Sequence, residues 1–164
     1  MLLLKPTLFI PNVTDISLNL FKKMDIEAII LDIDDTLVPP KENEINEEIL
    51  NWTYIIKSSN IKIILVSNNF KKRVGKIAQK LDLPYIYWGM KPLTTGINRA
   101  VKILDVSKEK IAVIGDQIFT DVLGANLAGV KSILINPLTP GKSITLKLKR
   151  FMEKPIRKKF QKQG

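Results

Sequence analysis

The 164-residue chain combines 45% hydrophobic residues with a formal net charge of +10, and it contains neither cysteine nor histidine. This length supports a single globular domain, residues 1–164, with its own hydrophobic core. The two absences exclude a Ser-His-Asp hydrolase, a Cys-His enzyme and an ordinary zinc centre, because each needs an imidazole or a thiolate. Any chemistry must therefore use carboxylates, hydroxyls and lysines.

Residues 1–25 are expected to form an N-terminal extension packed on or beside the core. Their first apolar run is interrupted by Lys5 and Pro6, so it does not resemble a signal peptide. No stretch approaches the ~18 uncharged apolar residues of a membrane-spanning helix. A helix is predicted over residues 14–24, with Thr14 or Asp15 as its cap. We expect a cytoplasmic protein, soluble or peripheral on the inner face of a membrane.

Short apolar runs rich in β-branched residues predict buried parallel strands. They cover residues 26–31, 61–66, 111–114 and 132–135, with a weaker run at 85–87. Apolar stripes with helical spacing lie at residues 45–56, 74–81, 97–104 and 122–126. This alternation predicts the α/β class, as a Rossmann-like three-layer sandwich with a central parallel sheet of about five strands. In such sheets, ligands bind beyond the carboxyl ends of the strands.

Clustered acids follow two of the predicted strands. Residues 32–36 read D-x-D-x-T, and residues 115–121 read G-D-x-x-x-T-D. A single D-x-D-x-T match has roughly a 2% chance of occurring in a chain of this length. Two such motifs, each at a strand end, make an ordinary acidic loop a poor explanation. Clustered carboxylates raise one another's pKa unless a cation neutralises them, and all-oxygen ligation without imidazole indicates Mg²⁺.

In this order the motifs resemble those of the haloacid dehalogenase-like superfamily, in its phosphatase branch, from residue 26 to about residue 137. The resemblance implies that Asp32 is the nucleophile and that Asp34 is the general acid/base. It also implies that Ser67, Asn68 and Lys91 bind the substrate phosphate, with Lys91 neutralising both the nucleophile and the phosphate. An acid at position 34 is typical of phosphatases rather than of the related ATPases.

The same resemblance implies a metal site and a reaction course. Mg²⁺ would be held by Asp32, by the backbone carbonyl of Asp34 and by Asp116, with Asp121 contacting it directly or through water. Asp32 would attack phosphorus in line and form an aspartyl-phosphate. Asp34 would protonate the departing oxygen and then activate the water that releases phosphate.

The spacing of the motifs leaves little room for a cap domain. Only 34 residues separate Asp32 from Ser67, and 23 residues separate Ser67 from Lys91. We therefore expect an open site, which favours a substrate that is large or is presented on a surface.

Residues 142–164 form a basic amphipathic tail, in which nine Lys and Arg residues accompany one acid, Glu153. Pro155 is expected to divide the tail into two short helices. Such a segment can bind an anionic bilayer, pack its apolar face on the body, or do both, and a lysine-rich composition without any function is a further reading. The apolar stripe consists of Ile144, Leu148, Phe151, Met152, Ile156 and Phe160.

Over its whole length the chain is similar to the capless IIIA subfamily, which includes phosphatidylglycerophosphate phosphatases. The resemblance implies a phosphorylated substrate, foremost this anionic lipid at a membrane surface, and phosphatidylglycerol as the product. Two alternatives stay open: a capless phosphatase acting on a nucleic-acid end or a phosphoprotein, and a non-catalytic adaptor for RNA or the ribosome. Few aromatic residues accompany the basic tail, which disfavours a nucleic-acid partner.

Overall fold

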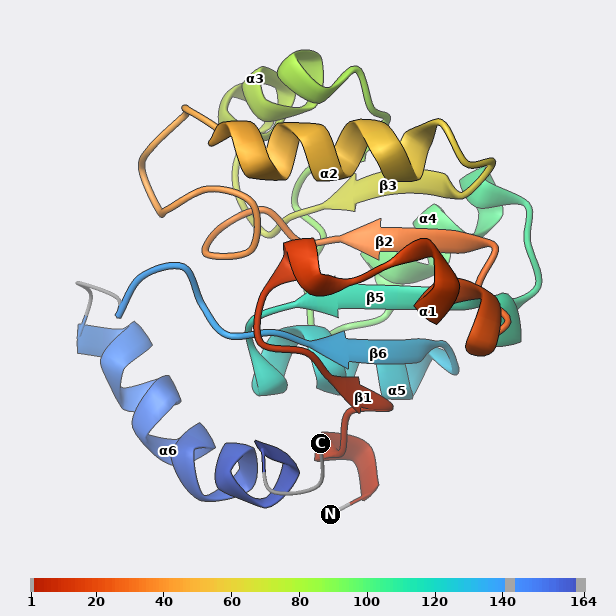
Figure 1. Ribbon diagram of the computed structural model, residues 1–164. Coiled ribbons are helices and arrows are strands. Elements are labelled where there is room, and N and C mark those ends of the chain that lie inside the picture. Colours follow the sequence, from red (N-terminus) through yellow and green to blue (C-terminus); the bar gives the residue numbers. More distant parts are fainter. Residues whose placement is uncertain (1, 141–143, 162–164) are drawn as a thin grey trace.

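The computed structural model describes residues 2–140 and 144–161, which form a single parallel sheet with helices on both faces (Figure 1). Across these residues six strands follow the order β1-β6-β5-β2-β3-β4, and each neighbouring pair is parallel. The expected α/β class with a central parallel sheet is confirmed. The strands are β1 Leu8–Phe9, β2 Ala28–Leu31, β3 Lys62–Val66, β4 Tyr85–Ile86, β5 Ile111–Gly115 and β6 Lys131–Leu134.

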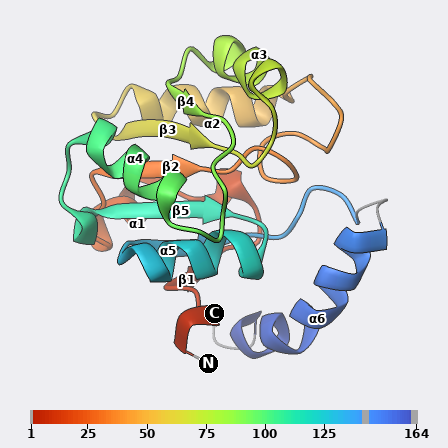
Figure 2. The same cartoon turned by 180° about the vertical axis from the view of Figure 1, so that it is seen from behind.

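The helices make up the two outer layers. One face of the sheet carries α1 (Leu18–Lys23), α2 (Glu47–Lys57) and α3 (Lys71–Leu81), as Figure 1 shows. The other face carries α4 (Thr95–Leu104) and α5 (Leu123–Ala128), which lie in front of the sheet in Figure 2. The remaining elements are η1 Leu2–Leu4, η2 Val13–Asp15, η3 Lys108–Lys110, the π-helical turn η4 Ile118–Val122, and α6 Ile144–Gln161.

Strand β2 shows why the sheet is apolar on both faces. Its side chains alternate between two cores: Ile29 and Leu31 pack in the core under α1, α2 and α3, whereas Ala28 and Ile30 pack in the core under α4 and α5. Every residue of this strand is buried. A parallel strand covered on both sides therefore reads as one continuous apolar run, which is the pattern found in the sequence.

The N-terminal segment adds a strand that the sequence analysis did not predict. In β1, Leu8 lies opposite Ile133 and Phe9 lies opposite Leu134 of β6. Ile10 N–H continues the pairing by donating to the carbonyl oxygen of Leu134 at 3.0 Å. A two-residue, half-buried strand carries no periodic pattern, so only pairing with β6 identifies it.

The helix predicted over residues 14–24 is wrong in its first part. Residues Val13–Asp15 form a separate 3₁₀ turn, and Ile16 is extended, with φ −77° and ψ 105°. The carbonyl oxygen of Ile16 accepts a hydrogen bond from the indole of Trp52 on α2, at 2.8 Å. Helix α1 then begins at Leu18, and Ser17, rather than Thr14 or Asp15, accepts the capping hydrogen bond from Leu20 N–H.

The described part of the tail is one continuous helix, α6, so the predicted division at Pro155 is wrong. Proline removes one backbone hydrogen bond from a helix. Here the residues on either side, Glu153 and Arg157, both bond to the body of the protein and hold the helix through the proline. Lys142, Lys162 and the side chain of Ile144 lie outside the described part of the chain.

Glu153 attaches α6 to the turn η4. Its side chain is fully buried, and Oε1 accepts hydrogen bonds from Ile118 N–H at 2.8 Å and Phe119 N–H at 3.2 Å. Arg157 donates to the carbonyl oxygens of Ile135, at 3.0 Å, and of Asp116. Of the apolar stripe that was expected to pack on the body, Ile156 contacts the core, whereas Glu153 and Arg157 provide the hydrogen bonds that attach α6.

The outer face of α6 is exposed and carries large apolar side chains. Leu148, Phe151 and Met152 are 59%, 68% and 55% exposed. Throughout the described residues, each helix is too short or too polar to span a bilayer. A surface of this kind fits contact with a membrane surface or with another molecule.

Replacing Glu153 by Ala should weaken the whole fold. The substitution leaves the Ile118 and Phe119 N–H groups without an acceptor, at a cost of roughly 1–3 kcal/mol in the free energy of unfolding. Urea titration would measure this loss. Lys154→Ala, at the exposed neighbouring position, is the control and should change the free energy by less than about 0.5 kcal/mol. Equal effects of the two variants would contradict the capping role of Glu153.

Candidate active site

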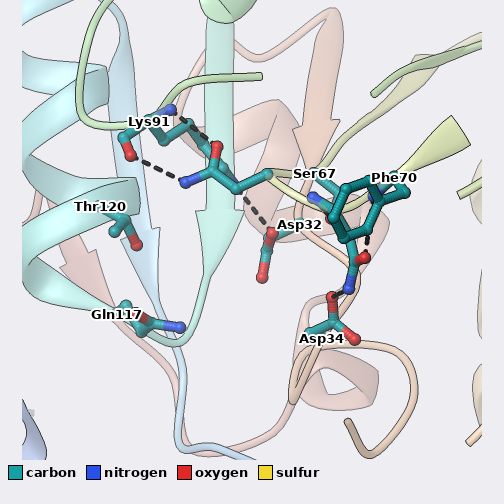
Figure 3. Close-up of a pocket in the computed structure, with 9 residues that line it drawn as sticks. Asp32, Asp34, Ser67, Phe70, Lys91, Gln117 and Thr120 are labelled. Atoms are coloured by element: carbon teal, nitrogen blue, oxygen red, sulfur yellow. Dashed lines mark hydrogen bonds and ion pairs between the residues drawn. The ribbon is translucent and has the colours of Figure 1, made fainter. Parts of the chain in front are cut away.

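Three adjacent strands bring polar residues to one edge of the sheet. Strand β2 pairs in parallel with both β3 and β5, so the carboxyl ends of the three strands coincide. Asp32, Ser67 and Asp116 are the residues that directly follow these strands. Figure 3 shows Asp32 and Ser67 in the pocket at this edge, with Lys91 beside them.

Lys91 connects two of the acids. Its Nζ lies 2.6 Å from Asp32 Oδ1 and 2.7 Å from Asp121 Oδ1. The Lys91 side chain is 2% exposed, as is that of Asp121, so water screens neither ion pair effectively. Thr36 adds a longer hydrogen bond, donating to Asp32 Oδ2 at 3.4 Å.

Burial and the neighbouring charges set the protonation states of Asp32 and Lys91. Burial raises the pKa of Asp32 to about 7, against the lowering effect of Lys91, and the nearby carboxylate of Asp121 adds to the rise. Burial on its own would lower the pKa of Lys91, but the carboxylates of Asp121 and Asp32 outweigh it and raise that pKa. The lysine is therefore a permanent cation, and the raised pKa of Asp32 brings the loss of its proton closer to neutral pH.

Asp32, Asp116 and Asp121 form a buried acidic cluster, in which one oxygen of each lies within 4.8 Å of the others. Burial, with the neighbouring carboxylates of Asp121 and Asp32, raises the pKa of Asp116 well above its ordinary value. Among the described residues, no donor reaches the buried Oδ1 of Asp116. Such an oxygen is costly unless a cation neutralises it, so this all-oxygen cluster fits a hard divalent metal ion.

Gly115 makes room for Asp121 in the cluster. A Cβ at position 115 would lie 2.3 Å from Asp121 Cγ, which is far inside van der Waals contact. Asp121 sits in the turn η4, and its Oδ2 accepts a hydrogen bond from Gln117 N–H at 3.1 Å. Both oxygens of Asp121 thus have donors, whereas Asp116 keeps one oxygen free of donors among the described residues.

Ser67 and Asn68, which directly follow β3, also line the pocket. Ser67 is 1% exposed and lines the pocket, where its Oγ accepts a hydrogen bond from Asn69 N–H at 3.2 Å. Asn68 holds the backbone of Lys91 at two points, because its Nδ2 donates to the Lys91 carbonyl and its Oδ1 accepts from the Lys91 N–H, each at 2.8 Å. Its amide therefore positions the lysine that the sequence analysis singled out.

Asp34 lies apart from the acidic cluster. Arg73 of α3 donates to Asp34 Oδ1 through Nε at 2.9 Å and through Nη2 at 2.6 Å. Asn69 Nδ2 donates to Asp34 Oδ2 at 3.2 Å. The carboxylate is held at the pocket wall, near Asp32 but directed toward α3.

The tail also reaches this edge of the sheet. Arg150 of α6 donates through Nη2 to Asp35 Oδ2 at 2.7 Å and lies 3.5 Å from Asp116 Oδ2. Asp35 is 1% exposed, and its Oδ1 accepts hydrogen bonds from the backbone and hydroxyl of Thr139, at 3.0 and 2.7 Å. Asp35 therefore ties the D-x-D-x-T loop to the segment that leads into α6.

The pocket has a volume of about 280 Å³. The 57 intervening residues of the two motif intervals are all described, and they form α2, β3, α3, β4 and their loops, with no inserted domain over the pocket. The lining residues are Asp32, Asp34, Ser67, Asn68, Asn69, Phe70, Lys91, Gln117 and Thr120.

The sequence analysis missed the roles of Arg73, Arg150 and Asn69. Arg73 and Arg150 reach their acids across 39 and 115 residues of chain. Each is one of several basic residues on an amphipathic helix, so no local pattern distinguishes it from its neighbours. Asn69 follows Ser67 closely enough to have been considered as part of the same strand-end turn.

Comparison with known proteins assigns this site to a family. The model of the haloacid dehalogenase-like hydrolases matches residues 40–129, more than half of the chain. A protein from Bacillus subtilis named probable phosphatase YqeG is 33% identical over 159 residues, covering 97% of this chain and 92% of that protein. The mitochondrial phosphatidylglycerophosphatase GEP4 of Saccharomyces cerevisiae is 29% identical over 150 residues, covering 81% of this chain and 78% of that protein.

The fold also matches solved structures. The cobalt-bound deoxy-D-mannose-octulosonate 8-phosphate phosphatase YrbI of Haemophilus influenzae superposes with a TM-score of 0.56 at 15% identity, covering 78% of this chain and 77% of that chain. At this identity the likeness concerns the fold alone. From the family match and the extended similarity to YqeG, the chain belongs to the haloacid dehalogenase-like hydrolases and is a phosphatase of that family.

Proposed function

We propose that the protein is a Mg²⁺-dependent phosphomonoesterase in which Asp32 is transiently phosphorylated, and that its substrate is phosphatidylglycerophosphate. One observation carries the chemical part. The carboxylate of Asp32 lines an open pocket 2.6 Å from the ammonium of Lys91, beside the acidic cluster with Asp116 and Asp121. A nucleophile beside a permanent cation, and open to substrate, is the arrangement that phosphoryl transfer needs.

In the first step, an oxygen of Asp32 forms a bond to phosphorus while the bond from phosphorus to the substrate oxygen breaks. Lys91 neutralises charge on the transferring group, and the Ser67 hydroxyl donates to one of its oxygens. The departing alkoxide receives a proton from Asp34. The products of this step are the alcohol and an acyl phosphate on Asp32.

In the second step, water attacks the phosphorus of the acyl phosphate. Asp34, now a carboxylate, accepts a proton from this water, and the bond between phosphorus and the Asp32 oxygen breaks. Inorganic phosphate leaves and the Asp32 carboxylate is restored. Asp34 lines the same pocket as Asp32, and Arg73 and Asn69 hold its carboxylate at the pocket wall.

Mg²⁺ is the metal that this donor set favours. Carboxylate oxygens without imidazole or thiolate are the ligands of a hard cation that retains water. Asp32 and Asp116 would ligate it together with the backbone carbonyl of Asp34. Asp121 would contact the ion directly or through water, since its oxygens also accept hydrogen bonds from Lys91 and from Gln117 N–H. The bound ion would supply positive charge to the phosphate oxygens.

Three features support a lipid substrate. The similarity to GEP4, named a phosphatidylglycerophosphatase, extends over 81% of the chain. The pocket is open, with no inserted domain among the described residues that could enclose a small metabolite. Helix α6 exposes Phe151 and Met152 beside the exposed Lys147 and Lys154, as a membrane-surface helix does. We place the protein on the cytoplasmic surface of a membrane.

Asp32→Asn should abolish phosphate release, with a loss of at least about 10³-fold, because the amide cannot form the acyl phosphate. Phosphate release from a soluble chromogenic ester would measure it, with circular dichroism to verify the fold. Asp105→Asn is the matched control, since Asp105 is exposed and its positive φ of 50° suits asparagine. Near-normal turnover by the Asp32→Asn variant would contradict the assignment of Asp32 as the nucleophile.

The affinity for Mg²⁺ should rise with pH. The pKa of Asp32 is raised to about 7, so below that value the ion must displace a proton. We expect the affinity to gain up to about tenfold per pH unit for each displaced proton as the pH rises toward 7. Calorimetric titrations at several pH values test this. An affinity that does not change across the range would contradict direct ligation by Asp32.

The substrate proposal predicts Mg²⁺-dependent phosphate release from phosphatidylglycerophosphate in mixed micelles. Activity on this lipid should exceed that on an end-phosphorylated oligonucleotide, a phosphopeptide and a soluble sugar phosphate. Comparison of kcat/KM for the four substrates shows which substrate class the enzyme prefers. Preference for the oligonucleotide or the phosphopeptide would replace the lipid by the corresponding alternative, while Asp32 would keep its role.

A further inference from the structure

Large apolar side chains are exposed on two segments that also supply the pocket residues Phe70 and Lys91. They come from the start of α3 and from the loop between β4 and α4. We call this surface the apolar rim, and it consists of Phe70, Tyr87, Trp88, Met90 and Leu93, which are 64%, 38%, 54%, 49% and 59% exposed. Phe70 itself lines the pocket, and Figure 3 shows its ring beside Ser67 and Asp34. Exposed apolar groups gathered at a site opening mark an interaction surface.

The rim is held in place by the backbone of the site. Trp88 N–H donates to the Asn69 carbonyl at 3.2 Å, and Gly89 N–H donates to the Ser67 carbonyl at 2.9 Å. The rings of Phe70 and Trp88 meet edge to face, with centroids 5.2 Å apart at 89°. These contacts join the two rim segments to each other and to the loop that follows β3, which contains Ser67 and Asn69.

Two rim residues have a costly backbone conformation. Trp88 has a φ of 49° and Met90 a φ of 54°, in the left-handed region that bulky residues avoid. This conformation is unfavourable because the Cβ of an L-residue approaches the following carbonyl oxygen. Their side chains are half exposed, so burial in the free protein offsets little of this cost. A conformation that directs apolar side chains outward at a site opening points to a binding role.

The charge of the surroundings indicates the partner. Between residues 69 and 94 there are six basic residues and one acid. Arg73, Lys80 and Lys91 pair with acids from other segments, which leaves three exposed lysines, Lys71, Lys72 and Lys76. The acid, Asp82, is paired with Lys57 at the far end of α3. Lys71 and Lys72 are exposed in the first turn of α3, and Lys71 Nζ lies 5.9 Å from the centroid of the Tyr87 ring. Aromatic side chains interleaved with lysines are typical of proteins that bind the interface of an anionic bilayer.

We infer that the apolar rim docks on an anionic lipid bilayer and holds the open pocket over the head groups. This inference deepens the proposed function and rests on a lipid substrate. A folded partner or a second copy seated on the rim would cover the pocket mouth, whereas a bilayer presents substrate to it. Because the rim is pinned by hydrogen bonds, little conformational entropy is lost on docking. The rim provides a membrane contact separate from the outer face of α6.

The test uses the full chain carrying Trp88→Asn and Leu93→Ser. Asparagine tolerates the positive φ at position 88, and both positions are more than half exposed, so the fold should persist. The matched control is Tyr54→Ser with Ile103→Ser, which removes equally exposed apolar groups, 70% and 57%, from α2 and α4. Ile103 lies beside Lys62 at the start of β3, the edge opposite the pocket.

Binding is measured by flotation without metal, with vesicles of phosphatidylcholine and phosphatidylglycerol and with vesicles of phosphatidylcholine alone. We expect the rim variant to bind the anionic vesicles at least about tenfold more weakly than the wild type, and the control to bind normally. Equal binding by rim variant and wild type overturns the inference. So does an equal loss in the control, or a loss seen only in a Phe151→Ser, Met152→Ser variant of α6.

Hydrolysis separates this inference from the proposed function. On a soluble chromogenic ester, kcat/KM of the rim variant should stay within about twofold of wild type, because Trp88 and Leu93 lie outside the pocket lining. On phosphatidylglycerophosphate in vesicles its kcat/KM should fall at least about tenfold. A wild type inactive on the lipid refutes the substrate, whereas an active wild type matched by the rim variant refutes only the docking surface.

Discussion

A single buried ammonium makes the acidic edge of this sheet possible. Asp32, Asp116 and Asp121 are all buried, and three carboxylates so close together repel one another strongly in a region of low dielectric. Lys91 binds two of them at 2.6 and 2.7 Å, and Arg150 approaches the third at 3.5 Å. Within the described part of the chain, one oxygen of Asp116 remains without a donor, which suits a metal ion.

The position of Lys91 depends on a tightly built loop. Asn68 binds its backbone at two points, and Gly89 packs so closely on α4 that a Cβ at Gly96 would lie 2.3 Å from the Gly89 carbonyl oxygen. The same loop carries Trp88 and much of the apolar rim. The rigid loop between β4 and α4 therefore places Lys91 beside Asp32. The same loop exposes the apolar side chains that we infer dock on a bilayer.

The basic residues of α6 fall into two groups, arginines that contact the body and lysines that are exposed. Arg150 and Arg157 both turn inward. Arg150 pairs with Asp35 at the acidic edge, whereas Arg157 pairs with Glu153 and donates to the backbone of Asp116. Lysines such as Lys154 and Lys158 stay exposed on the outer side. The net charge of the sequence does not distinguish the two groups, because each arginine and each lysine contributes the same charge. Only the packing of the helix on the body shows which residues face inward.

The sequence by itself determined the sheet and the edge at which its acids gather. Continuous apolar runs identify β2, β3 and β5 because both faces of these strands are buried, and parallel strands end at a common edge, which brings Asp32, Ser67 and Asp116 together. Only the tertiary structure decided the short strand β1, the start of α1, the unbroken α6 and the partners of Asp34 and Asp35. Periodicity records which face of an element is buried, whereas pairs such as Arg73 with Asp34 depend on where loops place single side chains, for which the local sequence holds no repeating signal.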